Sequence, residues 1–130
     1  MGAITLATGE KVMLDTSPFI FHIEEVEPYA SILAPLFDGI ATGRYSATTS
    51  VVTLIEVLTK PLREGRVELA LTFRCYLTQG RNLDLVLLTP DLAEQAAALR
   101  ARYRFKTPDA IQVATALAGD VQHSSLTTAS

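Results

Sequence analysis

Residues 12–20 read VMLDTSPFI, and this stretch decides how the rest of the chain is interpreted. Its first three residues are apolar and predict a short strand, which stops at Asp15 because a charge is costly inside a core. Thr16, Ser17 and Pro18 then supply capping hydroxyls and a proline suited to a first helical turn. The stretch therefore predicts a strand followed directly by a helix, with Asp15 at the carboxyl end of the strand.

The same alternation of strand and helix continues along the chain. Apolar spacing predicts two successive helices, broken at Pro28 and Pro35, within residues 19–36. Further helices are expected over 50–59, 65–77, 92–103 and 107–118. Further strands are expected over 45–49, 83–88 and 124–128, the LDLVLL run at 83–88 being typical of a buried strand. This order predicts an α/β fold with a central, mainly parallel sheet flanked by helices, whose sites lie at the carboxyl ends of strands.

Glu56 lies in the helix predicted over 50–59, which Pro61 is expected to end. The apolar stripe expected to face the core consists of Val51, Leu54, Ile55 and Leu58. Glu56 falls on the opposite side, near Val52 and Thr53, where a glutamate is commonly just an exposed residue. The apolar neighbours on that side set it apart from an ordinary solvated surface.

Asp109 opens the last predicted helix, with Thr107 as the cap and Pro108 as the first helical residue. A carboxylate there is stabilised by the helix dipole by about 0.3 to 1 kcal/mol, which alone could explain it, just as Asp15 could be only a cap. Three carboxylates about 5 Å apart would repel by roughly 3 kcal/mol per pair at an effective dielectric of about 20. A divalent cation is the simplest partner for Asp15, Glu56 and Asp109 together.

The bulk composition limits the class of protein. A chain of 130 residues has the size of one domain, so residues 12–130 are expected to form a single domain after a short leader at 1–11. The net charge of -3 argues against binding nucleic acid through an overall positive field. The single cysteine, Cys75, cannot form an internal disulfide and has no zinc-site spacing. Without a signal-peptide or membrane-span pattern, a cytoplasmic location and no membrane association are expected.

Basic residues gather in two groups along the chain. They are Lys60, Arg63 and Arg66 in the first group, and Arg100, Arg102, Arg104 and Lys106 in the second. The first group follows Glu56 and the second precedes Asp109. Such residues are commonly the solvated ends of helices, but beside an acidic metal centre they would hold the phosphates of RNA. The candidates for this contact are Lys60, Arg63, Arg104 and Lys106.

Three motifs in this order, LDTSPFI, IEVL followed by KP, and PDAIQVATAL, resemble the PIN-domain nucleases, and most of all the VapC-type toxin ribonucleases of bacterial toxin–antitoxin systems. The resemblance runs from about residue 12 to residue 126. It implies a PIN-like three-layer sandwich and an endoribonuclease that depends on Mg²⁺ or Mn²⁺ and hydrolyses RNA phosphodiester bonds with a metal-activated water. It also implies a cognate antitoxin as partner. The apolar content of 48% adds the expectation of a homodimer, because another chain would cover exposed apolar surface.

Carried over to this sequence, the resemblance makes Asp15, Glu56 and Asp109 the catalytic, metal-binding acids. Thr16, Ser17 and Thr127 would contact either the metal-binding acids or the phosphate of the RNA. Members of the family carry a further aspartate after the last strand, where this chain has Ala129. They also continue past this point with a strand and a helix, so the domain is expected to be truncated at its carboxyl end.

The substitution at Ala129 leaves three alternatives open. The site can work with three carboxylates, or the fourth can come from Asp120 or from residues beyond Ser130. In the third alternative, a degenerate PIN domain has lost catalysis and binds RNA or protein. Other α/β classes fit less well, since the first strand is not followed by GxGxxG and Ser17 stands where an aspartyl-phosphate phosphatase has a second aspartate. A receiver-like domain fits the topology alone.

Overall fold

The computed structural model describes residues 6–118 and 123–126 of the chain. Four strands form one parallel sheet in the order β3-β2-β1-β4. Their bounds are Lys11–Leu14 for β1, Ser46–Ser50 for β2, Leu83–Val86 for β3 and His123–Leu126 for β4. In this order the chain moves outward from β1 to β3 and then crosses back to the other side of β1. The carboxyl end of β1 therefore lies at the point where the strand order reverses, which is where α/β sheets place their ligands.

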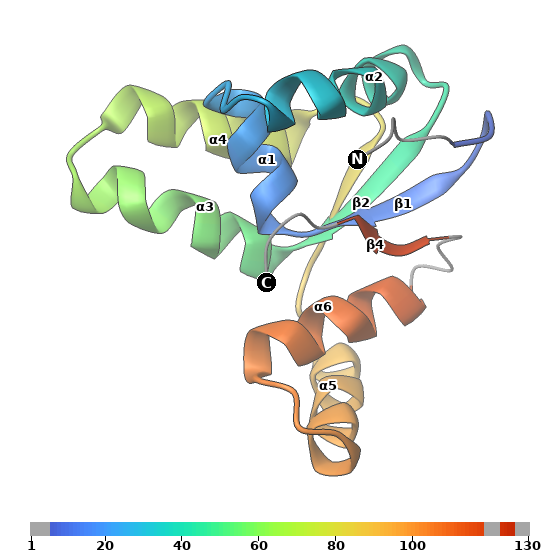
Figure 1. Cartoon of the computed structure of the whole chain (residues 1–130). Coiled ribbons are helices and arrows are strands. Elements are labelled where there is room, and N and C mark those ends of the chain that lie inside the picture. Colours follow the sequence, from blue (N-terminus) through green and yellow to red (C-terminus); the bar gives the residue numbers. More distant parts are fainter. Residues whose placement is uncertain (1–5, 119–122, 127–130) are drawn as a thin grey trace.

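In the part of the chain that the structure describes, six helices cover the two faces of this sheet (Figure 1). Helices α1 (Thr16–Ile23), α2 (Tyr29–Thr42), α3 (Val51–Arg63) and α4 (Val67–Gln79) lie on one side, and α5 (Pro90–Arg102) and α6 (Thr107–Ala118) on the other. Because crossovers between parallel strands are right-handed, reversing the direction along the sheet moves the connecting helices to the opposite face. The α/β fold with a central parallel sheet in a three-layer arrangement, predicted from the sequence, is confirmed.

Each helical layer encloses its own core. The larger core lies between the sheet and α1 to α4 and contains Val12, Leu14, Phe19, Leu33, Leu36, Phe37, Ile40, Ala47, Val57, Phe73 and Leu77. The smaller core lies under α5 and α6 and contains Val52, Leu92, Ala96, Ala110, Ile111 and Ala114. Val52 belongs to α3, so the first turn of α3 reaches the layer of α5 and α6. This junction lies beside the carboxyl ends of the strands.

Two prolines that were expected to break helices lie inside them. Pro35 is within α2 and Pro61 is within α3, whereas Pro28 does precede α2 as predicted. Pro35 is exposed, so solvent can reach the carbonyl that a proline leaves without its helical hydrogen bond. Pro61 is buried, and packing of its ring offsets the lost hydrogen bond in the last turn of α3.

The buried face of α3 agrees only in part with the predicted one, since Leu54 and Leu58 pack against the larger core but are partly exposed. Its buried residues are Val52, Thr53, Val57 and Pro61, while Ile55 is 61% exposed. The helix has two apolar stripes, and spacing alone does not decide between them because α3 contacts both helical layers. Glu56, one turn from Val52 and Thr53, therefore lies at the edge of the buried face.

The run at 83–88 was also wrongly predicted to be a fully buried strand. Strand β3 ends at Val86 and lies at an edge of the sheet, and Leu87 and Leu88 are exposed. An edge strand has one neighbour, so its side chains are less covered than those of a central strand. None of the helices in the described part of the chain is both long and apolar enough to cross a membrane.

A candidate active-site pocket

A cavity of about 390 Å³ lies at the carboxyl ends of the strands, between the two helical layers. It is lined by Asp15, Thr16, Ser17, Glu56, Lys106, Pro108, Asp109 and Gln112. The three acids come from the end of β1, from α3 and from the first turn of α6. The fold therefore brings together, around one cavity, carboxylates that are 41 and 53 positions apart in the sequence (56 minus 15, and 109 minus 56).

Asp15 occupies the N-cap position of α1 with an extended backbone (φ -97°, ψ -157°). Its side chain nevertheless makes no capping hydrogen bond to the first turn of the helix. The Oδ1 atom is buried although the residue lines the cavity. A capping role therefore does not account for this aspartate.

Glu56 is connected to the first turn of α1 by a hydrogen bond. The hydroxyl of Thr16 donates to Glu56 Oε1 at 2.5 Å, which joins α1 to α3 across the mouth of the cavity. Because the bond uses one carboxylate oxygen, it orients the side chain and leaves the other oxygen for a ligand.

Asp109 and Lys106 lie on opposite sides of the start of α6. The helix begins at Thr107, and the carbonyl of Lys106 accepts the amide of Ala110 at 2.9 Å. Thr107 is thus helical and not the cap that the sequence predicted, a shift of one residue. Asp109 remains in the first turn, where the helix dipole favours its charge. The pocket therefore combines three acids with one lysine.

Gln112 lines the cavity although sequence reasoning did not select it. Ser50 Oγ donates to its Oε1 at 2.8 Å, and its Nε2 donates to Thr53 Oγ1 at 2.9 Å. A signal was present, because Gln112 is a single amide in the apolar run AIQVATALA, three residues after Asp109 and on the same side of a helix. Residues at this spacing line one face together.

The other predicted contact residues do not line this cavity. Lys60, Arg63 and Arg104 are exposed and absent from its wall. Three further arginines bind elsewhere in the protein: Arg66 approaches Glu24 at 4.0 Å, Arg100 donates to the carbonyl of Phe105, and Arg102 lies over the ring of Tyr103. Thr127, Asp120 and Ala129 lie outside the described residues.

The donor chemistry of the cavity fits a hard divalent cation. Carboxylates and hydroxyls are the oxygen ligands that Mg²⁺ and Mn²⁺ prefer, and the wall provides both. Within residues 6–118 and 123–126, however, no three His, Cys, Asp or Glu side chains lie close enough together to hold a metal ion. The acids thus share a cavity without converging on one point.

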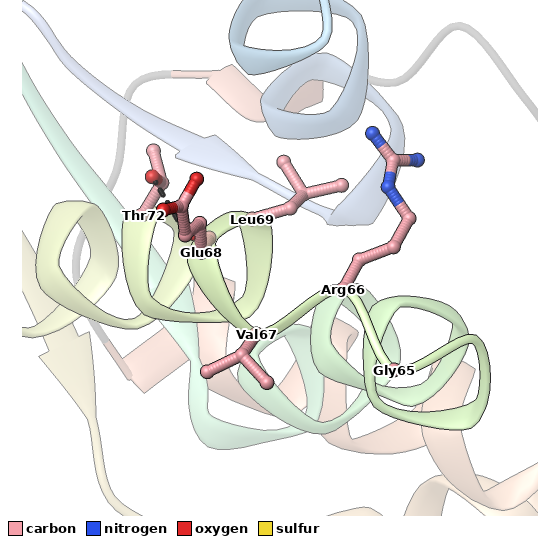
Figure 2. A pocket seen from close by; sticks show the side chains of 6 residues that line it. All are labelled: Gly65, Arg66, Val67, Glu68, Leu69 and Thr72. Atoms are coloured by element: carbon pink, nitrogen blue, oxygen red, sulfur yellow. Dashed lines mark hydrogen bonds between the residues drawn. The ribbon is translucent and has the colours of Figure 1, made fainter.

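A second, larger cavity of about 600 Å³ lies where α4 begins (Figure 2). It is lined by Gly65, Arg66, Val67, Glu68, Leu69 and Thr72. The Thr72 hydroxyl donates to the backbone carbonyl of Glu68 at 3.0 Å, and Arg66 is the residue that pairs with Glu24. With a single carboxylate in its wall, this cavity has no cluster of acids for catalysis.

Comparisons with known proteins agree with this fold. The family model described as PIN domain matches residues 12–123. Among solved structures, similarity is found to Mycobacterium tuberculosis VapC20, a Sarcin-Ricin loop cleaving toxin, with 18% identity over 89% of each chain and a TM-score of 0.71. A toxin-antitoxin complex from Klebsiella pneumoniae gives 20% identity over 89% of this chain and 96% of the other, with a TM-score of 0.64.

The structure of VapBC2 from Rickettsia felis bound to a DNA fragment from its promoter is similar as well. The identity is 15% over 87% of this chain and 85% of the other, with a TM-score of 0.62. At these identities the three structures show a shared fold. No curated protein matches the sequence significantly.

Proposed function

The chain belongs to the PIN domain family, and from this premise we propose that it is a metal-dependent endoribonuclease, the toxin of a toxin–antitoxin pair. The observation that carries the proposal is the cavity at the carboxyl end of β1, whose wall includes Asp15, Glu56 and Asp109 from three elements. Its position agrees with the rule that open α/β sheets bind ligands where the strand order reverses.

The residues of the cavity have distinct roles in this proposal. Asp15 and Asp109 would hold Mg²⁺ or Mn²⁺, and Glu56, oriented by Thr16, would position a ligand or the attacking water. The chemistry that such an ion would supply there is activation of water at neutral pH and compensation of the negative charge on the scissile phosphate. Lys106, on the same wall, contacts a phosphate of the RNA. Lys60, Arg63 and Arg104 would extend this contact outside the cavity.

An antitoxin partner is supported by two similar structures, which are a VapBC assembly and a toxin-antitoxin complex. Large apolar side chains are exposed on α3 and α4, and they are Ile55, Leu62, Val67 and Leu71. Exposed apolar side chains are costly in water, and contact with a second protein chain would cover them. A homodimer remains a proposal on the same grounds.

The test is cleavage of a labelled single-stranded RNA by the full chain, with Mg²⁺ or Mn²⁺ and with a chelator. We expect metal-dependent cleavage that Asp15→Asn abolishes. Asp84→Asn is the matched control, because Asp84 is exposed on β3 and does not line the cavity. If Asp15→Asn cleaves as the unchanged chain does, the catalytic assignment is wrong.

A non-catalytic PIN domain that binds RNA or protein is the second candidate. The observation in its favour is that the acids do not converge into a group of three within the described residues. In that case neither the unchanged chain nor Asp15→Asn would cleave RNA with any divalent metal. Growth inhibition on expression would then survive Asp15→Asn, because it would depend on binding and not on the acids.

A further inference from the structure

We propose that Gln112 is a positioning residue, which fixes the spacing of Glu56 and Asp109 across the cavity by connecting α6 to α3 and β2. This inference rests on the proposed function of the cavity. It concerns a residue that contacts neither a reacting atom nor a metal in this proposal, and whose effect is transmitted through the two acids.

The two hydrogen bonds of Gln112 reach two different elements. Its Oε1 accepts from Ser50, the last residue of β2, and its Nε2 donates to Thr53 in the first turn of α3. Both distances are short, at 2.8 Å and 2.9 Å. Because the amide uses both ends, one as acceptor and one as donor, rotation of the side chain would break both bonds.

The partners of Gln112 are fully buried. Ser50 and Thr53 are both 0% exposed, so water cannot replace the amide as their partner. A buried hydroxyl without a hydrogen bond is destabilising. A shift of α6 would take Gln112 away from Ser50 and Thr53 and leave both hydroxyls unpaired, so the observed position of α6 is strongly preferred. The position of α6 relative to α3 is therefore determined by a directional contact, in addition to the apolar packing around Val52.

The spacing along each helix transmits this contact to the acids. Gln112 follows Asp109 by three residues on α6, and Thr53 precedes Glu56 by three residues on α3. Residues three apart lie on the same face of a helix, about one turn from each other. The hydrogen bond between Gln112 and Thr53 thus lies one turn after Asp109 along α6 and one turn before Glu56 along α3. Since α3 and α6 belong to opposite layers of the sandwich, their relative position is not fixed by a shared layer (Figure 1).

The test compares Gln112→Met, which keeps the length of the side chain but makes neither hydrogen bond, with the unchanged chain. Spin labels at Ile55 on α3 and Leu117 on α6, both more than 60% exposed, report the distance between the helices in a Cys75→Ser background without metal. We expect Gln112→Met to shift or broaden this distance distribution. An unchanged distribution would overturn the inference, whatever the protein does with metal or RNA.

A second measurement separates positioning from stability. Binding of Mn²⁺, followed by the electron paramagnetic resonance signal of the free ion, is expected to weaken about tenfold or more in Gln112→Met. The double variant Gln112→Met with Thr53→Val removes one of the two buried hydroxyls that have lost their partner, so it should regain part of the lost stability in urea while Mn²⁺ binding stays weak. If Mn²⁺ binding recovers together with stability, Gln112 is only structural and the inference fails.

Ile111→Val serves as the control, because it weakens the packing of α6 and leaves both hydrogen bonds of Gln112 in place. It should bind Mn²⁺ as the unchanged chain does. An unchanged chain that binds no Mn²⁺ would contradict the proposed metal-dependent function, while the distance measurement would still decide the role of Gln112. In a cleavage assay, Gln112→Met is expected to lower kcat with little change in KM for RNA.

Discussion

At the scale of single residues, two aspartates have the same local sequence and different surroundings. Thr89, Pro90 and Asp91 open α5, and the same three residue types open α6 with Asp109. Both carboxylates lie in a first helical turn and interact favourably with the dipole. Asp109 lines the cavity with the other acids and Asp91 does not. The pair therefore separates a role in the helix from a role in the site.

We predict that Asp109→Asn reduces the rate of RNA cleavage by about 100-fold or more, because it removes a charged ligand from the cavity. Asp91→Asn is expected to leave the rate within about twofold. Each variant should lose a similar free energy of unfolding, about 0.3 to 1 kcal/mol, since each loses one dipole interaction. Steady-state kinetics and urea unfolding measure the two effects. Equal rates for the two variants would show that Asp109 is only a helix-start residue.

For single residues, local sequence was informative only in part. A charge that interrupts an apolar run singled out Asp15, but the Thr-Pro-Asp sequence alone does not separate Asp109, which lines the cavity, from Asp91, which does not. Gln112 was missed because its function depends on Ser50 and Thr53, which are about 60 residues away in the sequence. No local pattern carries the information that these three side chains meet. Long-range hydrogen bonds of this kind become visible only with the packed fold.

At the scale of elements, α3 shows why a helix can be predicted correctly while its buried face is not. Its apolar residues form two stripes, and Val57 packs in the larger core and Val52 in the smaller one, while Ile55 lies at the surface. We predict that Val57→Ala costs about 2 kcal/mol of unfolding free energy, because it leaves a space in the larger core. Ile55→Ala should cost about 0.5 kcal/mol or less. Urea unfolding measures both losses. A larger loss in Ile55→Ala than in Val57→Ala would mean that the face predicted from the sequence, which contains Ile55, is the buried one.

His22 of α1 packs against α2, and this contact is expected to make the stability of the fold depend on pH. The ring of His22 stacks on Phe37 with centroids 4.0 Å apart, and burial lowers the pKa of His22 below 6.5 despite the nearby charges of Asp38 and Glu25. Below pH 6.5 the unfolded chain therefore binds this proton more readily than the folded one. The stability contributed by neutral His22 is complete above the unfolded pKa and is lost as the pH falls.

We accordingly expect the urea midpoint of the unchanged chain to fall between about pH 7 and pH 5 more steeply than that of His22→Phe, whose ring stacks without titrating. The carboxylates titrate in both proteins, so the difference between the two slopes isolates the histidine. Parallel slopes would mean that the surroundings of His22 do not disfavour its protonated form. The half-buried neighbour Tyr76, whose pKa burial raises to about 12, stays neutral throughout this range.

At the scale of the whole molecule, the alternation of strands and helices was sufficient to predict the class of fold. The sequence order of elements requires parallel strands, and right-handed crossovers then distribute the helices over both faces. What it did not predict is the position of β1 beside the returning strand β4, because strand order depends on long-range pairing. That position places Asp15 at the cavity whose wall also includes Glu56 of α3 and Asp109 of α6.

An ion bound between these layers would connect three separately positioned elements, so it should stabilise the entire fold and not only the site. Binding to the folded state alone adds about 2.7 kcal/mol at an ion concentration about 100 times the Kd, or roughly 10 °C in Tm for a domain of this size. We predict that adding Mn²⁺ raises the Tm of the unchanged chain by this amount. The rise in Tm should be lost in Asp15→Asn and kept in Asp91→Asn, which retains all three acids of the cavity. Differential scanning calorimetry measures it without any RNA. An increase of the same size in Asp15→Asn would place the ion elsewhere on the protein, because the Asp15 carboxylate in the cavity would then not be needed to hold it.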